Sequence, residues 1–284
     1  DVPVVLATHR LFSLSLRIKN LGNFIVWPFN VLPRLFPGIF EEHPFYKGLI
    51  EDLFINRKKV LQFFDLLTDE NSKIALNVII GFRITLCPDI LGGIIVPDAY
   101  FASTIVEFGN NDIMIDGGAF EGDTVKAFIN KTNNEFKRIF AFEPSTYSCS
   151  ILRKNFKKDQ RIRVIQACLY DENRTICFED TGLRDAAINT ERGISCRAYA
   201  LDEFVKDIPV SFMKLNVEGA EDKVIKGAKN IIERYKPAIA VAVYHRPSHL
   251  WYVPQLLKSI NSSYKIFFRH HGEGLIESVV YAVT

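Results

Sequence analysis

The 284-residue chain lacks an excess of charge of either sign. Its 35 basic and 33 acidic residues leave a formal net charge of +2 at pH 7. Asp159 directly follows the densest basic stretch, residues 153–158, so we interpret that stretch as the solvated end of a helix. Because nucleic-acid-binding proteins usually carry a basic patch or stripe, we expect no nucleic-acid partner.

Cysteine is scarce and irregularly placed. The five cysteines form an odd set without a Cys-x-x-Cys pair: Cys87, Cys149, Cys168, Cys177 and Cys196. A disulfide framework uses an even set of cysteines, and a zinc site uses closely spaced ones. We therefore expect reduced thiols in a cytoplasmic protein, and we assign no metal ligands.

Long apolar runs are missing too. A transmembrane helix needs roughly 18 or more consecutive apolar residues, and no run in this chain approaches that length. Residues 23–29 are apolar, but the run is short and Pro28 interrupts it. The chain begins at Asp1 with neither Met nor a basic segment, so no signal peptide is visible, and the start also fits a fragment of a longer protein.

Hydrophobic residues make up 48% of the chain, which suits a globular protein, and the length favours one complete domain plus a smaller piece. At the N-terminus, a strand-like run, a helical pattern and a second strand-like run predict one βαβ unit. One unit cannot cover both faces of its sheet. We therefore interpret residues 1–44 as a leader, or as the tail of a truncated α/β domain, that could instead pack on the main domain.

Two helical patterns follow, at residues 45–67 and 73–85, so we expect residues 45–99 to form a helical bridging segment. Residues 100–284 then alternate strand-like and helical stretches, which predicts a mostly parallel sheet. The seven strand candidates are residues 112–116, 138–142, 162–167, 211–217, 237–243, 264–268 and 277–283. The last two are separated only by a short loop, so they should form an antiparallel hairpin.

The central sequence feature is a glycine turn after the first of these strands. An apolar run ends in an acid and two glycines, and a third glycine precedes a helical stretch, which predicts a strand, a tight turn and a capped helix. Such a turn lets backbone approach a ligand closely. The cofactor-binding candidates in this turn are Asp116, Gly117, Gly118, Ala119, Gly122, Asp123 and Thr124. Our hypothesis is an S-adenosylmethionine site, with a purely structural turn as the alternative.

Two further strand ends carry polar residues. Glu143 and Pro144 end the second strand, where a carboxylate can accept hydrogen bonds from ribose hydroxyls, as the acid does in dinucleotide sites. Asn216, Glu218 and Glu221 follow the fourth strand, and Glu221 could serve only to cap the next helix. Because the carboxyl ends of parallel strands form the ligand crevice, we expect these residues to lie near the glycine turn.

These segments resemble, in content and order, the motifs of the FkbM family of S-adenosylmethionine-dependent methyltransferases. The motifs are residues 116–124, 142–144, 201–202, 214–221 and 244–245, and the resemblance covers about residues 100–284. It implies a class I (Rossmann-like) methyltransferase fold, S-adenosylmethionine as cofactor and O-methylation of hydroxyls on sugars, glycans or secondary metabolites. Segments before Tyr100 also resemble the leader of bacterial members linked to surface carbohydrate.

One position departs from the family, which usually has Asp where this chain has Asn216. An amide cannot act as a base and is a poorer ligand for a hard cation, so a metal-assisted mechanism loses support. The candidate base is His245, which follows the fifth strand, with His249, His270 and His271 as fallbacks. The catalytic candidates are thus His245, Glu218 and Asn216.

Two other functions stay open. Asn216 also fits a catalytically inactive module that binds a cofactor or a glycan. A nicotinamide dehydrogenase is disfavoured because the glycine spacing departs from Gly-x-Gly-x-x-Gly. The sequence identifies neither the acceptor, for which we expect a small molecule or a glycan, nor whether the protein is a homodimer.

Overall fold

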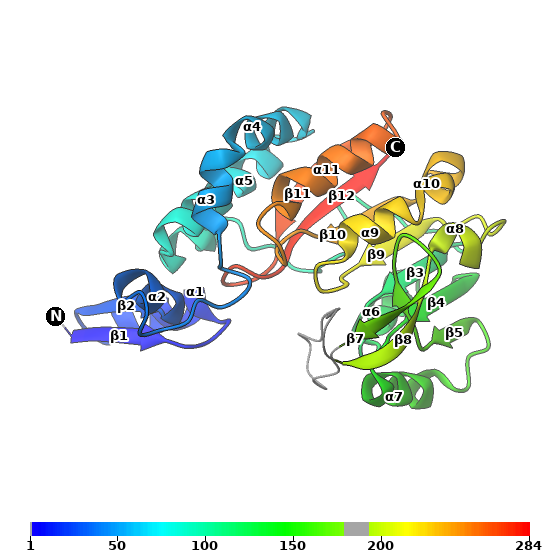
Figure 1. The fold of residues 1–284 in the computed structure, drawn as a ribbon, viewed down its shortest axis with the longest axis horizontal. Helices are drawn as coiled ribbons and strands as arrows, with labels where there is room; N and C mark the ends of the chain where they lie inside the picture. The colour runs from blue at the N-terminus through cyan, green and yellow to red at the C-terminus, as the bar shows by residue number, and fades with distance from the viewer. Residues whose placement is uncertain (1, 179–192) are drawn as a thin grey trace. The chain divides into compact units, whose positions relative to one another are not determined.

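The computed structural model describes residues 2–178 and 193–284 (Figure 1). The chain divides into two compact units. The first unit comprises Asp1–Ala99, Val243–Pro254 and Ile266–Val280, and the second comprises Tyr100–Ala242, Gln255–Lys265 and Tyr281–Thr284.

The first unit begins with the predicted βαβ arrangement. Strands β1 (Val2–Leu6) and β2 (Phe24–Pro28) pair in parallel, and helix α1 (Leu11–Lys19) connects them. Two short helical turns, η1 (Phe29–Val31) and α2 (Leu32–Leu35), occupy the beginning of the proline-rich stretch that follows.

The helices of the first unit differ in detail from the prediction. The single helical pattern over residues 45–67 forms two helices, α3 (Leu49–Ile55) and α4 (Arg57–Leu66), because Asn56 leaves helical geometry with φ −100° and ψ 19°. Helix α5 (Glu70–Thr85) begins three residues before the predicted start. Its N-cap, Asp69, accepts a 2.9 Å hydrogen bond from the Ser72 backbone N–H, which fixes the helix start there. A 3₁₀ turn, η2 (Pro88–Gly93), follows.

A seven-stranded sheet contains all seven predicted strands. They are β3 (Ile113–Gly117), β4 (Arg138–Phe142), β5 (Ile162–Ile165), β9 (Phe212–Leu215), β10 (Ala238–Ala242), β11 (Lys265–His270) and β12 (Ser278–Val283). Their order across the sheet is β11-β12-β10-β9-β3-β4-β5. The pairs of β3 with β4, β3 with β9, β4 with β5 and β10 with β9 are all parallel. The consecutive strands β11 and β12 are neighbours with a short link, so they form the predicted antiparallel hairpin.

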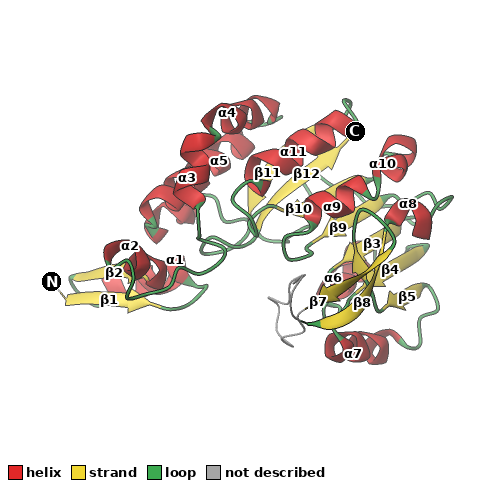
Figure 2. Cartoon of the chain, in the orientation of Figure 1, coloured by secondary structure: helices red, strands yellow, loops and turns green. Residues whose placement is uncertain are grey.

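Helices separate most of the main-sheet strands along the chain (Figure 2). They are α6 (Asp123–Lys131), α7 (Thr146–Phe156), α8 (Leu201–Phe204), α9 (Glu221–Lys226), α10 (Lys229–Tyr235) and α11 (His249–Ile260). Every residue of β3 is buried, as expected of a central strand in a parallel sheet. In the core of the second unit the rings of Phe128, on α6, and Phe212, on β9, lie parallel with centroids 6.3 Å apart.

A second, smaller sheet in the second unit has no counterpart among our predicted strands. Its strands are β6 (Cys168–Leu169), β7 (Arg174–Phe178) and β8 (Ile194–Tyr199), in the order β6-β8-β7. Strand β8 pairs in parallel with β6 and antiparallel with β7. A small apolar cluster, formed by Cys168, Ile176 and Ala198 with Tyr170 and Cys196 against them, holds the sheet together.

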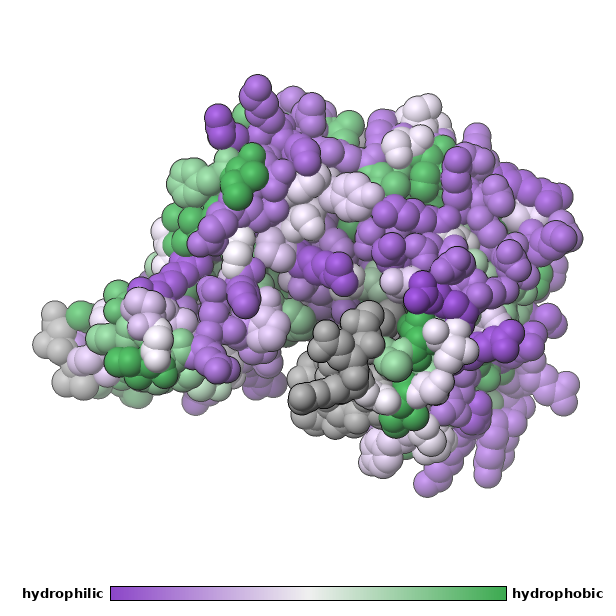
Figure 3. Space-filling model, viewed as in Figure 1, coloured by the Kyte–Doolittle hydropathy of each residue, from purple (hydrophilic) through white to green (hydrophobic). Residues whose placement is uncertain are grey.

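Hydrophilic residues predominate on the part of the second unit in view in Figure 3. Within the described ranges, no helix is long and apolar enough to cross a membrane.

Candidate functional site

The loops that follow β3, β4 and β9 are joined to one another in the second unit. The backbone N–H groups of Gly118 and Ala119 donate hydrogen bonds of 3.1 and 3.0 Å to the carbonyl of Phe142 at the end of β4. The Asn216 N–H, just after β9, donates a 3.0 Å bond to the carbonyl of Gly117. The structure therefore brings together the three polar strand ends whose convergence the sequence predicts.

Two of the three turn glycines are required by the backbone. Gly118 has φ +75°, and a Cβ placed on it would lie 1.9 Å from the backbone oxygen of Asn216. Gly122 has φ +92°, and its Cβ would lie 2.3 Å from the ring of Phe156. Gly117 is less constrained, since its nearest contact would be a side-chain atom at 3.1 Å. Only glycine therefore allows the first loop to pass so close to the loop after β9.

Asp116 lies at the base of this loop and is completely buried. The ammonium nitrogen of Lys214 is 2.9 Å from its Oδ1, and the Thr124 hydroxyl donates a short hydrogen bond to its Oδ2. Lys214, itself 1% exposed, also donates bonds of 3.2 and 2.6 Å to the carbonyls of Gly117 and Gly118. The donors that a buried carboxylate requires thus come from the chain itself.

This buried ion pair sets the electrostatics below the glycine turn. Burial raises the pKa of Asp116 above its usual range, and the charge of Lys214 is the strongest influence in the opposite direction. Sequence reasoning missed the role of Lys214, which lies in the motif of residues 214–221. The available signal was a lysine inside the otherwise apolar strand β9, because a lysine is almost never fully buried unless it is paired.

Glu143 is held firmly at the end of β4 with 6% of its surface exposed. Its Oε2 accepts a 2.8 Å hydrogen bond from the Phe120 N–H, and its Oε1 accepts a 2.9 Å bond from the Ser145 N–H. Burial raises the pKa of this carboxyl, and the two backbone bonds oppose that shift. Because each carboxylate oxygen has two lone pairs, Glu143 keeps the capacity to accept bonds from a ligand.

Two loop residues other than glycine adopt left-handed backbone conformations. Phe120, in the first loop, has φ +48°, and Glu218, in the loop after β9, has φ +50°. Such conformations are costly and cluster at active sites and ligand clamps. Glu218 is half-buried, as is Asn216, while Asp123 is exposed at the start of α6.

Glu221 closes the loop that contains Glu218. The side chain is fully buried, and its Oε1 accepts bonds from the backbone N–H groups of Val217 and Gly219, at 2.9 and 3.4 Å. Glu221 is also the first residue of α9. These bonds hold the loop that precedes α9, and among the described residues α9 itself has no side-chain cap hydrogen bond.

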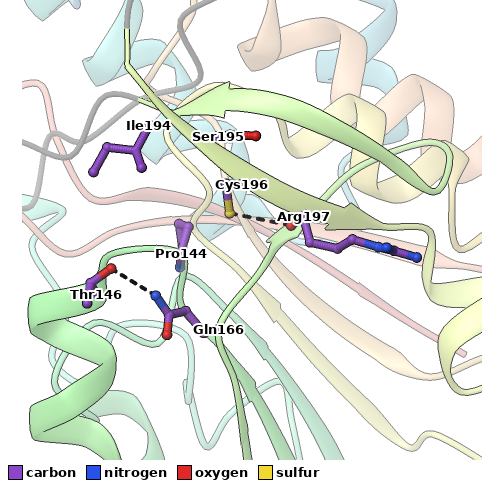
Figure 4. A pocket seen from close by; sticks show the side chains of 7 residues that line it. All are labelled: Pro144, Thr146, Gln166, Ile194, Ser195, Cys196 and Arg197. Carbon is purple, nitrogen blue, oxygen red and sulfur yellow. Dashed lines mark hydrogen bonds between the residues drawn. The ribbon is translucent and has the colours of Figure 1, made fainter.

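A pocket of about 170 Å³ opens beside Pro144, the residue that follows Glu143 (Figure 4). Pro144, Thr146 and Gln166 line one side, and residues 194–197 of β8 line the other. Gln166 and Thr146 point toward each other, and the Gln166 amide donates a 2.9 Å hydrogen bond to the Thr146 hydroxyl. Strand β8 was not predicted from the sequence, so sequence reasoning missed the side of the pocket that β8 forms.

His245, the candidate base, belongs to the first unit and is 6% exposed. Its ring lies against two aromatic rings, Phe45 at 5.4 Å and Tyr244 at 4.2 Å between centroids. The fallback His249, the first residue of α11, is 2% exposed.

The other two fallback histidines have structural bonds. His270 is fully buried in β11, its Nδ1 lies 3.0 Å from the Ser278 hydroxyl, and burial lowers its pKa to about 3. The His271 Nδ1 donates a 2.9 Å hydrogen bond to the Val96 carbonyl, and burial lowers its pKa too. The ring of neither histidine is exposed in a way that would let it accept a proton from a substrate. Over the described ranges, no three His, Cys, Asp or Glu side chains gather in a way that could hold a metal ion.

Comparison with known proteins gives a matching family model and similar solved structures. Residues 109–270 match the family model described as the methyltransferase FkbM domain. The crystal structure of methyltransferase FkbM from Methylobacillus flagellatus KT matches with a TM-score of 0.81 and 21% identity, over 99% of this chain and 74% of that one. At this identity the match shows a shared fold.

Two further solved structures are similar over a smaller part of this chain. Precorrin-6y C5,15-methyltransferase from Geobacter metallireducens GS-15 gives a TM-score of 0.38 and 16% identity, over 62% of this chain and 79% of that one. Aeropyrum pernix fibrillarin, solved with bound S-adenosyl-L-methionine, gives 0.39 and 14%, over 65% and 73%. No protein of curated function matches the chain.

Proposed function

Because the chain belongs to the FkbM methyltransferase family, we propose that it transfers a methyl group from S-adenosylmethionine to a hydroxyl oxygen of a sugar, a glycan or a secondary metabolite. The chain has a class I, Rossmann-like methyltransferase fold. The observation that supports the cofactor most directly is Glu143, a buried carboxylate that two backbone N–H groups hold directly before Pro144, a residue that lines the pocket.

The residues around the pocket suit the parts of this cofactor. Glu143 would accept hydrogen bonds from the ribose hydroxyls, and Pro144 and Gln166 would border the adenine. The loop from Gly117 to Gly122 would approach the methionine part, because glycine leaves room for backbone contact. Asp116 is already bonded to Lys214 and Thr124, so we assign it to shaping this loop rather than to ligand contact.

The bound cofactor supplies an electrophilic methyl group on a sulfonium. The chain must align the acceptor oxygen with that methyl group, exclude water and remove the hydroxyl proton. We assign proton removal to His245, which follows β10 by three residues. Asn216 can hydrogen-bond to either ligand but cannot act as a base. Glu218, held in a left-handed conformation, is the third catalytic candidate.

His245→Gln tests the base. A general base contributes typically about 10²- to 10⁴-fold to the rate, so turnover should fall by about that factor while cofactor affinity stays unchanged. His9→Gln, at an exposed histidine, is the matched control and should keep full turnover. Full turnover in His245→Gln would remove this residue from the mechanism.

Glu143→Gln tests the ribose contact. Hydrogen bonds to a charged group contribute about 1.5–3 kcal/mol, so affinity for S-adenosylmethionine, measured by calorimetry, should fall about 10- to 150-fold. Glu135→Gln removes an exposed carboxylate in the same unit and should leave affinity unchanged. Equal affinities in the two variants would refute the ribose assignment.

Asn216 supports a second candidate, an inactive module that binds a cofactor or a glycan. A labelled-methyl assay over a panel of glycans and hydroxylated metabolites discriminates the two, since transfer to any acceptor rejects the inactive module. If the amide is what abolishes turnover, Asn216→Asp should create activity that the natural chain lacks. Light scattering on the purified chain would test the homodimer that the sequence leaves open.

A further inference from the structure

Two of the five thiols face each other in the small three-stranded sheet. The sulfur of Cys168, on β6, lies 3.6 Å from the sulfur of Cys196, on β8, and the Cys168 thiol donates a hydrogen bond to it. Cys168 pairs in register with Ala198 on the parallel strand β8. Cys196 is two residues before Ala198, so both thiols project from the same face of the sheet.

The two thiols have different surroundings. Cys168 is buried, with 6% of its surface exposed, whereas Cys196 is half-buried and lines the pocket beside Pro144 (Figure 4). The hydrogen bond from Cys168 lowers the pKa of Cys196 to about 7 and raises that of Cys168. Cys196 is therefore the thiol that a solute in the pocket can reach, and Cys168 is the buried partner that can resolve its oxidation.

We propose that Cys196 and Cys168 form a reversible disulfide when the protein meets a peroxide, and that this bond reshapes the pocket wall and weakens cofactor binding there. The effect on the cofactor rests on the proposed function, whereas the disulfide itself does not.

The reaction balances with one peroxide. The Cys196 thiolate attacks one oxygen of hydrogen peroxide, the O–O bond breaks, and a sulfenic acid and hydroxide form. The Cys168 sulfur then attacks the sulfenic sulfur. The S–O bond breaks, the S–S bond forms, and the thiol proton leaves with the departing hydroxide as water. Two thiols and one peroxide thus give one disulfide and two waters, and a dithiol reductant reverses the oxidation.

Bond formation must move the pocket wall. The sulfurs have to approach from 3.6 Å to the disulfide length of about 2 Å. Ser195 and Arg197, which flank Cys196 on β8, also line the pocket, so a shift of Cys196 moves three lining residues together. Strand β6 is only two residues long, so few ladder bonds oppose the shift.

Cys177 and Cys149 are not arranged to compete. Cys177 follows Ile176, the residue that pairs with Cys196 across β7 and β8, so its side chain projects from the opposite face of the sheet. It is exposed and serves as the matched control. Cys149 is fully buried in α7.

The disulfide is tested by treating the purified full chain with hydrogen peroxide and mapping tryptic peptides by mass spectrometry. Cleavage after Arg163, Arg174, Arg192 and Arg197 separates residues 164–174 from residues 193–197, with Cys177 in neither peptide. We expect these two peptides joined with the loss of two hydrogens, loss of two of the five titratable thiols, and recovery of both thiols with dithiothreitol.

Three variants complete this part of the test. Cys177→Ser should still form the joined peptides, whereas Cys168→Ser and Cys196→Ser should not. Sulfinic acid at Cys196 without a joined peptide in the natural chain, or cross-links between separate chains only, would overturn the disulfide.

Calorimetry with S-adenosylhomocysteine tests the effect on the pocket. We expect affinity at least tenfold weaker in the oxidised chain, restored by reduction, and no change when Cys168→Ser is treated in the same way. A joined peptide with unchanged affinity would overturn the switch. If the reduced chain does not bind this ligand, the proposed function fails, while the peptide map still decides the disulfide.

Discussion

Lys214→Met should destabilise the protein by about 3–5 kcal/mol, because it leaves the buried Asp116 carboxylate without its cation. At the observed separation of 2.9 Å, an effective dielectric constant of about 20 gives an attraction of about 6 kcal/mol. The variant also loses the bonds from Lys214 to the carbonyls of Gly117 and Gly118. Relief from burying the ammonium offsets part of this loss, which leaves the smaller net figure.

The measurement is the free energy of unfolding in urea, followed by circular dichroism. Lys226→Met is the matched control, since Lys226 makes a 3.1 Å pair with Asp222 but has 39% of its side chain exposed, and its loss should cost no more than about 1 kcal/mol. The double variant Asp116→Asn with Lys214→Met should recover part of the stability, because no buried charge remains. Equal stability of Lys214→Met and the Lys226→Met control would refute this account.

The pH dependence gives a second check with a defined sign. In the natural chain, burial already raises the folded-state pKa of Asp116 above its usual value, and removing Lys214 raises it further. Between the unfolded and folded pKa values the folded chain holds a proton that the unfolded chain has lost. The stability of Lys214→Met should therefore fall as pH rises through this window, by about 1.4 kcal/mol per pH unit. A flat difference between variant and natural chain from pH 4 to 7 would contradict the buried-charge explanation.

Gly118→Ala places a methyl group 1.9 Å from a backbone oxygen at a residue with φ +75°, so the free energy of unfolding should drop by about 2–4 kcal/mol. Gly109→Ala is the control, and its free energy of unfolding should change little because a Cβ there meets nothing within 4 Å. Arg83→Met should leave the free energy of unfolding in urea unchanged or raise it by about 1–3 kcal/mol, because the Nε and Nη2 atoms of the fully buried guanidinium have no hydrogen-bond partner among the described residues. A loss of more than about 2 kcal/mol would argue against this explanation. Arg269→Lys should lower the melting temperature, because the bidentate hydrogen bonds to Asp69, at 2.5 and 3.1 Å, need a planar guanidinium. An unchanged melting temperature would show that these bonds do not stabilise the protein.

The main sheet could be predicted because its strands are short apolar runs, most of which are separated by helical stretches. Parallel strands then place their carboxyl ends at one edge, which is why Gly118, Glu143 and Asn216 were expected together. The small sheet could not be predicted in this way. Its strands carry exposed charged residues, Arg174 and Arg197, and β6 has only two residues, so neither strict alternation nor length distinguishes it from loop.

The break between α3 and α4 was missed for a related reason. Apolar spacing continues on both sides of Asn56, and only the local backbone shows that the helix is interrupted there. The sequence pattern also does not show which side chains on neighbouring strands will contact each other. Lys214 and Asp116 are almost a hundred residues apart in the chain, and their contact follows from the pairing of β9 with β3, in which the two residues are direct partners.

Two of the buried acids of the site, Asp116 and Glu143, have different roles because their donors differ. Asp116 is held from within, by the Lys214 ammonium and the Thr124 hydroxyl, and has no exposed surface. Glu143 is held only by backbone N–H groups that leave lone pairs available, and it immediately precedes a residue that lines the pocket. The first acid therefore fixes the glycine loop before any ligand arrives, and the second remains to meet it. Such preorganisation removes part of the ordering cost of binding, so cofactor affinity should depend on Glu143 directly and on Asp116 only through the shape of the loop.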